Sequence, residues 1–354
     1  MRLSFIKHAS LVFLFDAVVG SCSLMSDDLA PCPQGLEISF TYDYNVERAD
    51  MFPDHVGGLT LYVFDMNGTL VRQQTENNSA TAQPLADPLY RMRVEGLEPG
   101  RYQLLALANQ RDQQQLLTAS GIRYRWPSLQ QGDAMSRLSV SLTADTAPAT
   151  DIREMLDTLW YAPVNAPLEA TVELDQMTPT CVSLMRDTKR LHVSLHQLDH
   201  PEDCDIDDYD IQITDRNATL LYDNSLDPQN AEVTYHPFDT WNTYYERTDG
   251  SLTEETAHAD LDFNRVMLRK AEDNPALLTI RHKGDDRIVA EVNLAEILAQ
   301  GRGAYERDNY SAQEFLDRCY DYHLDFILVD GQWQYITLRI HTLPWAKRIQ
   351  RTTI

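Results

Sequence analysis

Basic residues and long apolar runs are both scarce in this sequence. Its 354 residues include 30 Lys and Arg against 54 Asp and Glu, which gives a formal net charge of −24. Binding to nucleic acid requires clustered Lys and Arg side chains, and no cluster of the necessary size occurs, so a nucleic-acid partner is excluded. Only one apolar run is long, at residues 11–19, and a membrane span needs about 20 apolar residues. A polytopic membrane protein is therefore excluded as well.

Sequence motifs that carry chemistry are also missing. The chain has no Gly-x-Ser-x-Gly motif, no glycine-rich phosphate loop and no HExxH motif. Its five cysteines form no CxxC pair, which argues against a structural zinc site. We therefore predict no enzymatic activity, no cofactor and no bound metal. Cys22 is considered below, and the pairing of Cys32, Cys181, Cys204 and Cys319 stays open.

Two groups of residues suggest metal binding but do not meet its geometry. His192, His196 and His200 have a four-residue spacing that would bring them together on a helix. The alternation around them predicts a strand instead, in which four residues span roughly 13 Å, so one ion cannot bind both His192 and His196. The acidic run 202–210 lacks the glycine and the bidentate glutamate of a calcium-binding loop. We interpret it as a solvated loop that leads into a strand.

The N-terminus has the pattern of an export signal. Arg2 and Lys7 precede the apolar residues 11–19, and small residues follow before Cys22. Residues 19–22, Val-Gly-Ser-Cys, resemble a bacterial lipobox, whose cysteine is alkylated with diacylglycerol and becomes the first mature residue. We therefore predict a lipoprotein signal peptide at 1–21, lipidation of Cys22 and a tether at 22–35. An ordinary cleaved signal and a cytoplasmic N-terminal helix are the alternatives.

Alternation of apolar and polar residues dominates the body of the chain. It predicts strands at 36–42, 59–65, 137–143, 168–174, 188–196, 209–215, 276–281 and 336–340. The Asn67-Gly68 pair between two apolar stretches predicts a hairpin. The pattern Leu-x-Pro-Gly-x-Tyr at 97–102 recurs in transthyretin-like Greek-key sandwiches. Many short strands separated by turns favour a mostly β fold.

The strands divide into two groups. Residues 176–180 interrupt the strand pattern, so we predict two β-sandwich domains at 36–177 and 178–344. One short helix is predicted near the C-terminus, at 311–320. Ser311 is placed to cap it, and Glu314, three residues on, completes a capping box.

The last ten residues, 345–354, form a basic tail on an acidic protein. Pro344 separates the tail from the preceding strand, because proline cannot donate to a ladder. A solvated tail is one interpretation. The other is a segment that pairs with the sheet edge of a partner, with main-chain hydrogen bonds providing the affinity. The candidate partner-binding residues are Trp345, Lys347, Arg348, Ile349 and Arg351.

Segments spread over nearly the whole mature chain resemble the FimB-like family of fimbrial anchor and accessory lipoproteins. That family belongs to the type V pili of anaerobic Gram-negative bacteria. The resemblance rests on the residues at 32–36, 42–45, 61–65, 185–190, 209–215, 222–226, 313–318 and 345–348.

The resemblance implies two transthyretin-like sandwiches on a surface-exposed lipoprotein of the outer membrane, at the base of a fimbrium. Such an anchor holds the growing fimbrium and limits its length, and its partners are pilin subunits that assemble by strand exchange. Some relatives are tip or accessory subunits instead. The alternative function is a surface lipoprotein that binds a glycan or a host ligand.

Overall fold

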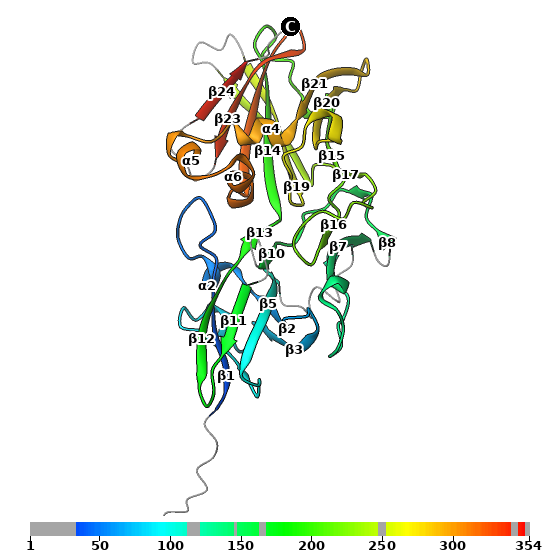
Figure 1. Ribbon diagram of the computed structural model, residues 1–354. Coiled ribbons are helices and arrows are strands. Elements are labelled where there is room, and N and C mark those ends of the chain that lie inside the picture. The colour runs from blue at the N-terminus through cyan, green and yellow to red at the C-terminus, as the bar shows by residue number, and fades with distance from the viewer. Residues whose placement is uncertain are drawn as a thin grey trace, which may run out of the picture.

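The computed structural model describes residues 33–111, 121–144, 147–162, 168–246, 253–340 and 346–350. These residues form two halves joined end to end, each built mainly from β-strands (Figure 1). The predicted mostly β fold with sandwich domains is confirmed. Among the residues described, no helix has the length and apolar character needed to cross a membrane.

The first half packs a three-stranded sheet against a six-stranded one. The small sheet contains β1 (Gly35–Thr41), β4 (Met92–Glu95) and β12 (Met177–Ser183). The large sheet contains β2 (Gly58–Asp65), β3 (Leu70–Asn77), β5 (Gly100–Asn109), β10 (Leu159–Ala162), β11 (Leu168–Val172) and β13 (Met185–Arg186). Their orders are β12-β1-β4 and β13-β10-β5-β2-β3, with β11 also paired to β5. The edge strand β12 runs parallel to β1.

Both faces of the large sheet are covered, which explains why seven of the eight residues of β2 are buried. Leu59, Leu61 and Val63 of β2 belong to the core between the two sheets of the first half. Tyr62 and Phe64 belong instead to a second apolar cluster, which continues into the other half of the molecule.

Strands from the middle of the chain cover that second face. They are β6 (Ile122–Arg125), β7 (Ser139–Ala144), β8 (Ala147–Pro148) and β9 (Asp151–Ile152). Strand β7 pairs with β16 (Thr219–Leu221), and β9 pairs with β17 (Val233–Tyr235). Leu138, Val140 and Leu142 lie in the same apolar cluster as Tyr62 and Phe64. The two halves therefore share one of their cores.

The second half packs a six-stranded sheet against a five-stranded one. The six-stranded sheet contains β14 (Lys189–Gln197), β18 (Asp239–Glu246), β19 (Thr253–Phe263), β22 (Asp321–Val329), β23 (Gln332–Ile340) and β24 (Ala346–Gln350). The other contains β15 (Tyr209–Asp215), β20 (Leu277–His282), β21 (Arg287–Asn293), β17 and β9. Their orders are β18-β19-β14-β22-β23-β24 and β21-β20-β15-β17-β9. Leu191, Val193 and Leu195 of β14 face the core, as the alternation predicted.

Short helices cover one side of this half (Figure 1). The predicted helix is α6 (Ala312–Arg318), and the Oγ of Ser311 accepts from the Glu314 N–H at 3.0 Å. The carboxylate of Glu314 pairs with Arg318 at 2.9 Å rather than completing the capping box. The sequence did not predict α2 (Phe52–His55), α4 (Leu294–Ala299) or α5 (Ala304–Asn309). It also did not predict the 3-10 turns Pro84–Ala86, Met135–Arg137, Ile206–Asp208 and Ala271–Asp273.

The chain passes between the halves later than the sequence predicted. The predicted boundary at 177/178 coincides with the start of β12, which pairs with β1 in the first half. Pro179 lies opposite Glu37 in this strand. An edge strand tolerates proline because one of its sides makes no ladder, so Pro179 does not end the strand. After β13 the chain passes into the second half through Asp187-Thr188-Lys189, although the short strand β9 has already joined the five-stranded sheet of that half.

Candidate functional site

Part of the predicted functional residues lies outside the described part of the chain. This part comprises the predicted signal peptide, the lipidation site Cys22 and the partner-binding residues Trp345 and Arg351, and Cys32 lies outside the described residues as well. The structure places Lys347, Arg348 and Ile349 on β24, at the edge of the six-stranded sheet.

Strand β24 pairs antiparallel with β23 of its own sheet. Ile349 lies opposite Ile336 and packs against the core, whereas the guanidinium of Arg348 lies 3.4 Å from the centroid of the Tyr335 ring. Lys347 helps to line a pocket of about 230 Å³ between β24 and the helices, together with Leu268, Glu296, Ala299, Gln300, Arg302, Arg307 and Ala312. Among the described strands only β23 pairs with β24, so the outer edge of β24 offers its backbone groups to a further strand.

The joint between the two halves contains several buried polar and charged residues. Asp187, Thr188 and Lys189 each have 1% or less of their surface exposed. The hydroxyl of Thr188 accepts from the Leu159 N–H at 3.0 Å and donates to the Asp157 carbonyl at 3.1 Å. The connection is thus fixed by side chains and by the backbone, and it does not resemble a solvated linker.

The ammonium group of Lys189 hydrogen-bonds to backbone carbonyls of both halves. Its Nζ donates to the carbonyl oxygens of Arg186 at 2.9 Å, Asp317 at 2.8 Å and Cys319 at 2.8 Å. An ammonium has three protons, so all its donors have acceptors. Arg186 belongs to β13 of the first half, whereas Asp317 belongs to α6 of the second. Burial lowers the pKa of Lys189.

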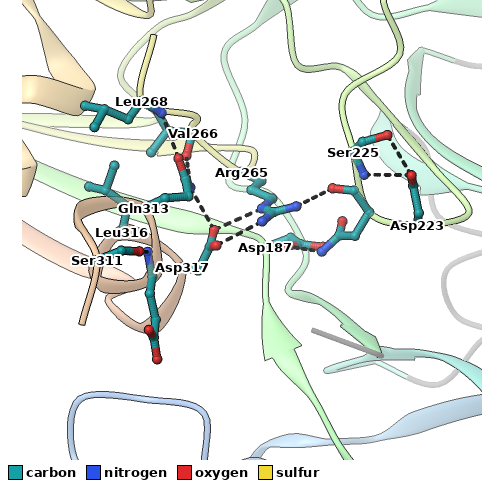
Figure 2. Close-up of polar contacts among 12 residues, drawn as sticks. Asp187, Asp223, Ser225, Arg265, Val266, Leu268, Ser311, Gln313, Leu316 and Asp317 are labelled. Carbon is teal, nitrogen blue, oxygen red and sulfur yellow. Dashed lines mark hydrogen bonds and ion pairs between the residues drawn. The ribbon is translucent and has the colours of Figure 1, made fainter. Parts of the chain in front are cut away.

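A buried ion pair continues this network (Figure 2). Arg265 Nε and Nη2 each donate to one carboxylate oxygen of Asp317 at 2.9 Å, and Arg265 Nη1 donates to the carbonyl of Asn224. The side chains of Arg265 and Asp317 are 8% and 5% exposed. A bidentate geometry with further hydrogen bonds is what a buried charge pair needs to offset its lost hydration.

Asp187 completes the network from the connecting segment. Its Oδ1 accepts from Asn224 Nδ2 at 3.2 Å, whereas its Oδ2 is buried and has no hydrogen-bond partner among the described residues. Burial raises the pKa of Asp187, and the nearby Arg265 opposes this shift. The carboxyl group therefore holds a proton more tightly than a solvated aspartate does.

A loop of the first half contacts helices α5 and α6 of the second half through aromatic and charged side chains. The Arg318 guanidinium lies 3.8 Å from the centroid of the Tyr44 ring, and Arg48 lies 3.6 Å from that of Tyr305. Tyr320 also donates to Glu47 at 2.9 Å. Cation–π contacts of this kind contribute about 0.5–2 kcal/mol each. These contacts and the shared core join the two halves on more than one side.

The predicted geometry of the histidines holds, since His192 and His196 lie on one strand with different partners. His192 Nδ1 bonds to Asp260 Oδ1 at 2.7 Å, and His196 Nδ1 bonds to Thr256 at 3.2 Å. In the acidic run, Asp205 caps the 3-10 turn by accepting from the Asp207 N–H at 3.0 Å. Within the described ranges, His200, Glu202 and Asp203 are the one group of three or more His, Cys, Asp or Glu residues whose ligand atoms all lie within 4.8 Å of one another.

No pattern in the sequence predicted the joint directly. Nevertheless, three of the segments that carried the family resemblance meet there: 185–190 at the connection, 222–226 around Asn224, and 313–318 in α6. Residues of these segments are far apart in the chain, and alternation patterns do not reveal such contacts.

Comparisons with known proteins agree with this fold. Residues 29–351 match the family model of fimbrillin-A associated anchor proteins Mfa1 and Mfa2. The minor fimbrium anchoring subunit Mfa2 of Porphyromonas gingivalis is 25% identical over 243 residues, which is 68% of each protein.

Two solved structures show the same fold over most of the chain. A candidate adhesin from Bacteroides thetaiotaomicron is 29% identical with a TM-score of 0.73, covering 91% of this chain and 100% of the other. The fimbrial anchor protein Mfa2 from Porphyromonas gingivalis has a TM-score of 0.60 at 19% identity, covering 91% and 100%.

Proposed function

Because the chain belongs to the family of fimbrillin-A associated anchor proteins Mfa1 and Mfa2, we propose that it attaches a fimbrium to the outer membrane as a surface lipoprotein. The match over residues 29–351 is the observation that carries this proposal. The anchor is the lipidated Cys22, and the protein takes part in fimbrial assembly and length control. The family is one of fimbrial anchor proteins and not a family of enzymes.

The structural features suit a mechanical role. An anchor transmits force between its membrane attachment and the fimbrium, so its domains must resist bending and separation. The buried connection at 187–189 and the core shared by both halves supply that resistance. Stable attachment to a membrane also requires more than one acyl chain, which a diacylglycerol-modified cysteine provides.

The proposed partner is a pilin subunit that pairs with the C-terminal strand region. The position of strand β24 supports the tail residues Trp345, Lys347, Arg348, Ile349 and Arg351 as the contact. Strand β24 is a short edge strand with a single strand partner among those described. Its backbone therefore either adds to a partner's sheet or leaves β23 so that a partner's strand replaces it.

The first experiment tests the anchor. In cells that express the Cys22→Ala variant, we expect the protein to leave the membrane fraction and the fimbriae to be shed into the medium or to grow overlong. Cys181→Ala is the matched control, because Cys181 is an exposed thiol on the edge strand β12. Unchanged retention of the Cys22→Ala variant in the membrane fraction would refute lipid anchoring.

The second experiment tests the tail. Deleting residues 345–354 removes strand β24, so the circular dichroism spectrum should remain that of a folded β protein with a slightly smaller strand signal, and copurification with pilin should be abolished. The double variant Lys347→Glu/Arg348→Glu keeps the backbone pairing of β24. It should weaken copurification with pilin and leave the fold unchanged. Copurification that survives both changes would place the pilin contact elsewhere. Loss of folding on deletion would show that β24 is an obligatory part of the core.

One observation favours a second function. The candidate adhesin from Bacteroides thetaiotaomicron is 29% identical to this chain with a TM-score of 0.73. An accessory or tip adhesin that binds a glycan or a host ligand is therefore the alternative. It predicts fimbriae of normal length and attachment after deletion of the gene, together with loss of adhesion.

A further inference from the structure

The face of the six-stranded sheet that points away from the core carries histidines from three neighbouring strands. His192 lies on β14, His258 on β19 and His323 on β22. In the strand register His258 lies opposite Ser194, and His323 lies opposite His192. The ring centroids of His192 and His258 are 5.4 Å apart, and those of His192 and His323 are 4.9 Å apart.

Three atoms of this cluster form a nearly equilateral triangle. His192 Nε2 lies 3.3 Å from His258 Nδ1, and Ser194 Oγ lies 3.2 Å from each of these nitrogens. A tetrahedral zinc ion holds nitrogen ligands at about 2.0–2.1 Å, which places two of them about 3.3 Å apart. The triangle thus has the dimensions of one face of a zinc coordination tetrahedron.

The outer nitrogen of each imidazole is held by another side chain. His192 Nδ1 bonds to the Asp260 carboxylate at 2.7 Å, and His258 Nε2 bonds to the Thr243 hydroxyl at 2.8 Å. Metal-binding histidines commonly donate their second N–H to a carboxylate or another oxygen, which fixes the tautomer and the ring orientation. A proton on each outer nitrogen leaves a lone pair on each inner one.

Aromatic neighbours hold the rings in place. The Trp241 ring stacks on His258 with a centroid distance of 5.2 Å and an interplanar angle of 15°. The rings are therefore preorganised, and ion binding has little side-chain freedom to remove. The His192 side chain is 16% exposed, so an ion reaches the site from solvent.

We propose that His192 and His258 bind a divalent transition-metal ion, with Zn²⁺ as the first candidate. The Ser194 hydroxyl or a water molecule takes the third position, and water or a ligand from another molecule takes the fourth. Imidazole nitrogen favours Zn²⁺, Cu²⁺ and Ni²⁺, whereas Ca²⁺ and Mg²⁺ prefer oxygen ligands. Without the ion, the other tautomer of His258, with its proton on Nδ1 and the Thr243 hydroxyl donating to Nε2, supplies a second donor beside the Ser194 hydroxyl for the hydrogen bonds among these three atoms.

The site differs from the histidine spacing visible in the sequence. His192 and His258 are 66 residues apart and meet only through the pairing of β14 with β19. It also differs from the exposed group of His200, Glu202 and Asp203. That group is the competitor that an experiment must separate from the proposed site.

The test is a calorimetric titration of the full chain with ZnCl₂, using an affinity tag free of histidine. We expect one ion bound per chain and a rise in the unfolding temperature that EDTA reverses. His258→Ala and His192→Ala should each abolish this ion, and Asp260→Asn should weaken it by about 10- to 100-fold. His196→Ala, on the same face of β14, and His200→Ala should leave it unchanged.

A substitution of Co²⁺ for Zn²⁺ provides a readout that is independent of stability. The visible absorption of the bound Co²⁺ should report nitrogen ligands and should disappear in the His258→Ala variant, whose fold is checked by circular dichroism. Absence of Zn²⁺ binding to the wild-type chain would overturn the proposal. So would binding that survives in both His192→Ala and His258→Ala, or that is lost in His200→Ala.

Discussion

Replacing Arg265 with methionine tests whether the polar network at the joint stabilises the protein. The substitution keeps most of the side-chain volume and removes the guanidinium. It leaves Asp317 as a buried carboxylate without its bidentate partner, and it removes a donor from the Asn224 carbonyl. Gln313 Nε2 still donates to Asp317 Oδ1 at 3.0 Å, which compensates only part of the loss.

The magnitude follows from burial. Removing one partner of a buried ion pair costs about 3–5 kcal/mol, because the other charge stays desolvated. The side chains of Arg265 and Asp317 are 8% and 5% exposed, so the full range applies. Native domains are stable by only about 5–15 kcal/mol, and the variant should therefore unfold at a clearly lower urea concentration. The double variant Arg265→Met/Asp317→Leu should recover about 2 kcal/mol or more, because it leaves no lone buried charge.

Two measurements separate global stability from opening of the joint. Urea unfolding followed by fluorescence gives the free energy of unfolding. Limited trypsin digestion reports the joint itself, since Arg186, Lys189 and Arg190 are cleavage sites at the connection and Lys189 is fully buried in the folded protein. We expect cleavage at 186–190 to accelerate in Arg265→Met under conditions in which the wild-type chain is intact.

Arg101→Met is the matched control. Arg101 pairs with Glu169 on the surface, where the two side chains are 59% and 46% exposed. Exposed pairs contribute about 0–1 kcal/mol, so this variant should unfold like the wild type. If Arg265→Met cost no more than Arg101→Met and left trypsin cleavage unchanged, the network would not be what stabilises the joint.

Two further predictions concern single groups. Burial raises the pKa of Asp157 to about 6, so the folded state binds its proton more tightly than the unfolded state, and stability falls as the pH rises from about 4 through about 6. Asp157→Asn should remove this pH dependence. In urea unfolding at pH 7 the variant should be up to about 2 kcal/mol more stable than the wild type, a limit set by the partial burial of Asp157. If the substitution changed the free energy of unfolding equally at pH 4 and at pH 7, this reasoning would be wrong. Ser311→Ala removes the cap of α6 and should cost about 1 kcal/mol, whereas Ser311→Asp should keep the stability near that of the wild type in the same assay.

Local patterns in the sequence predicted eight strands, and each of the eight overlaps a strand of the structure, because an alternating pattern marks a strand with one face in a core. Strand β15 coincides with the predicted 209–215, and β14 differs from the predicted 188–196 by one residue at each end. The hairpin at Asn67-Gly68 also forms. Only its glycine has a positive φ, of 76°, and Asp65 Oδ1 accepts from the Asn67 and Thr69 N–H groups. The residue types thus located the turn but did not determine its type.

Contacts between distant segments were beyond the reach of these patterns. Alternation assigned His192 to a strand face, but it predicted no strand around His258 and does not fix the register that places a nitrogen of one ring 3.3 Å from a nitrogen of the other. The helices α2 and α4 have four and six residues, too few for a helical period to stand out. Pro179 suggested a boundary because the edge position of β12, which tolerates proline, depends on the topology.

The arrangement of the joint has a consequence for how the proposed anchor carries force. Figure 1 shows β1 in one half and β24 in the other, so a force between the two ends crosses the connection at 187–189. A solvated linker there would let the halves swing freely. Instead, Tyr62 and Phe64 of the first half belong to the same apolar cluster as Leu191 and Phe326 of the second. Bending at the joint would therefore expose apolar surface and strip hydrogen bonds from Lys189, both of which cost free energy. Because these interactions break together, the joint resists small displacements until the force is sufficient to open it as a unit.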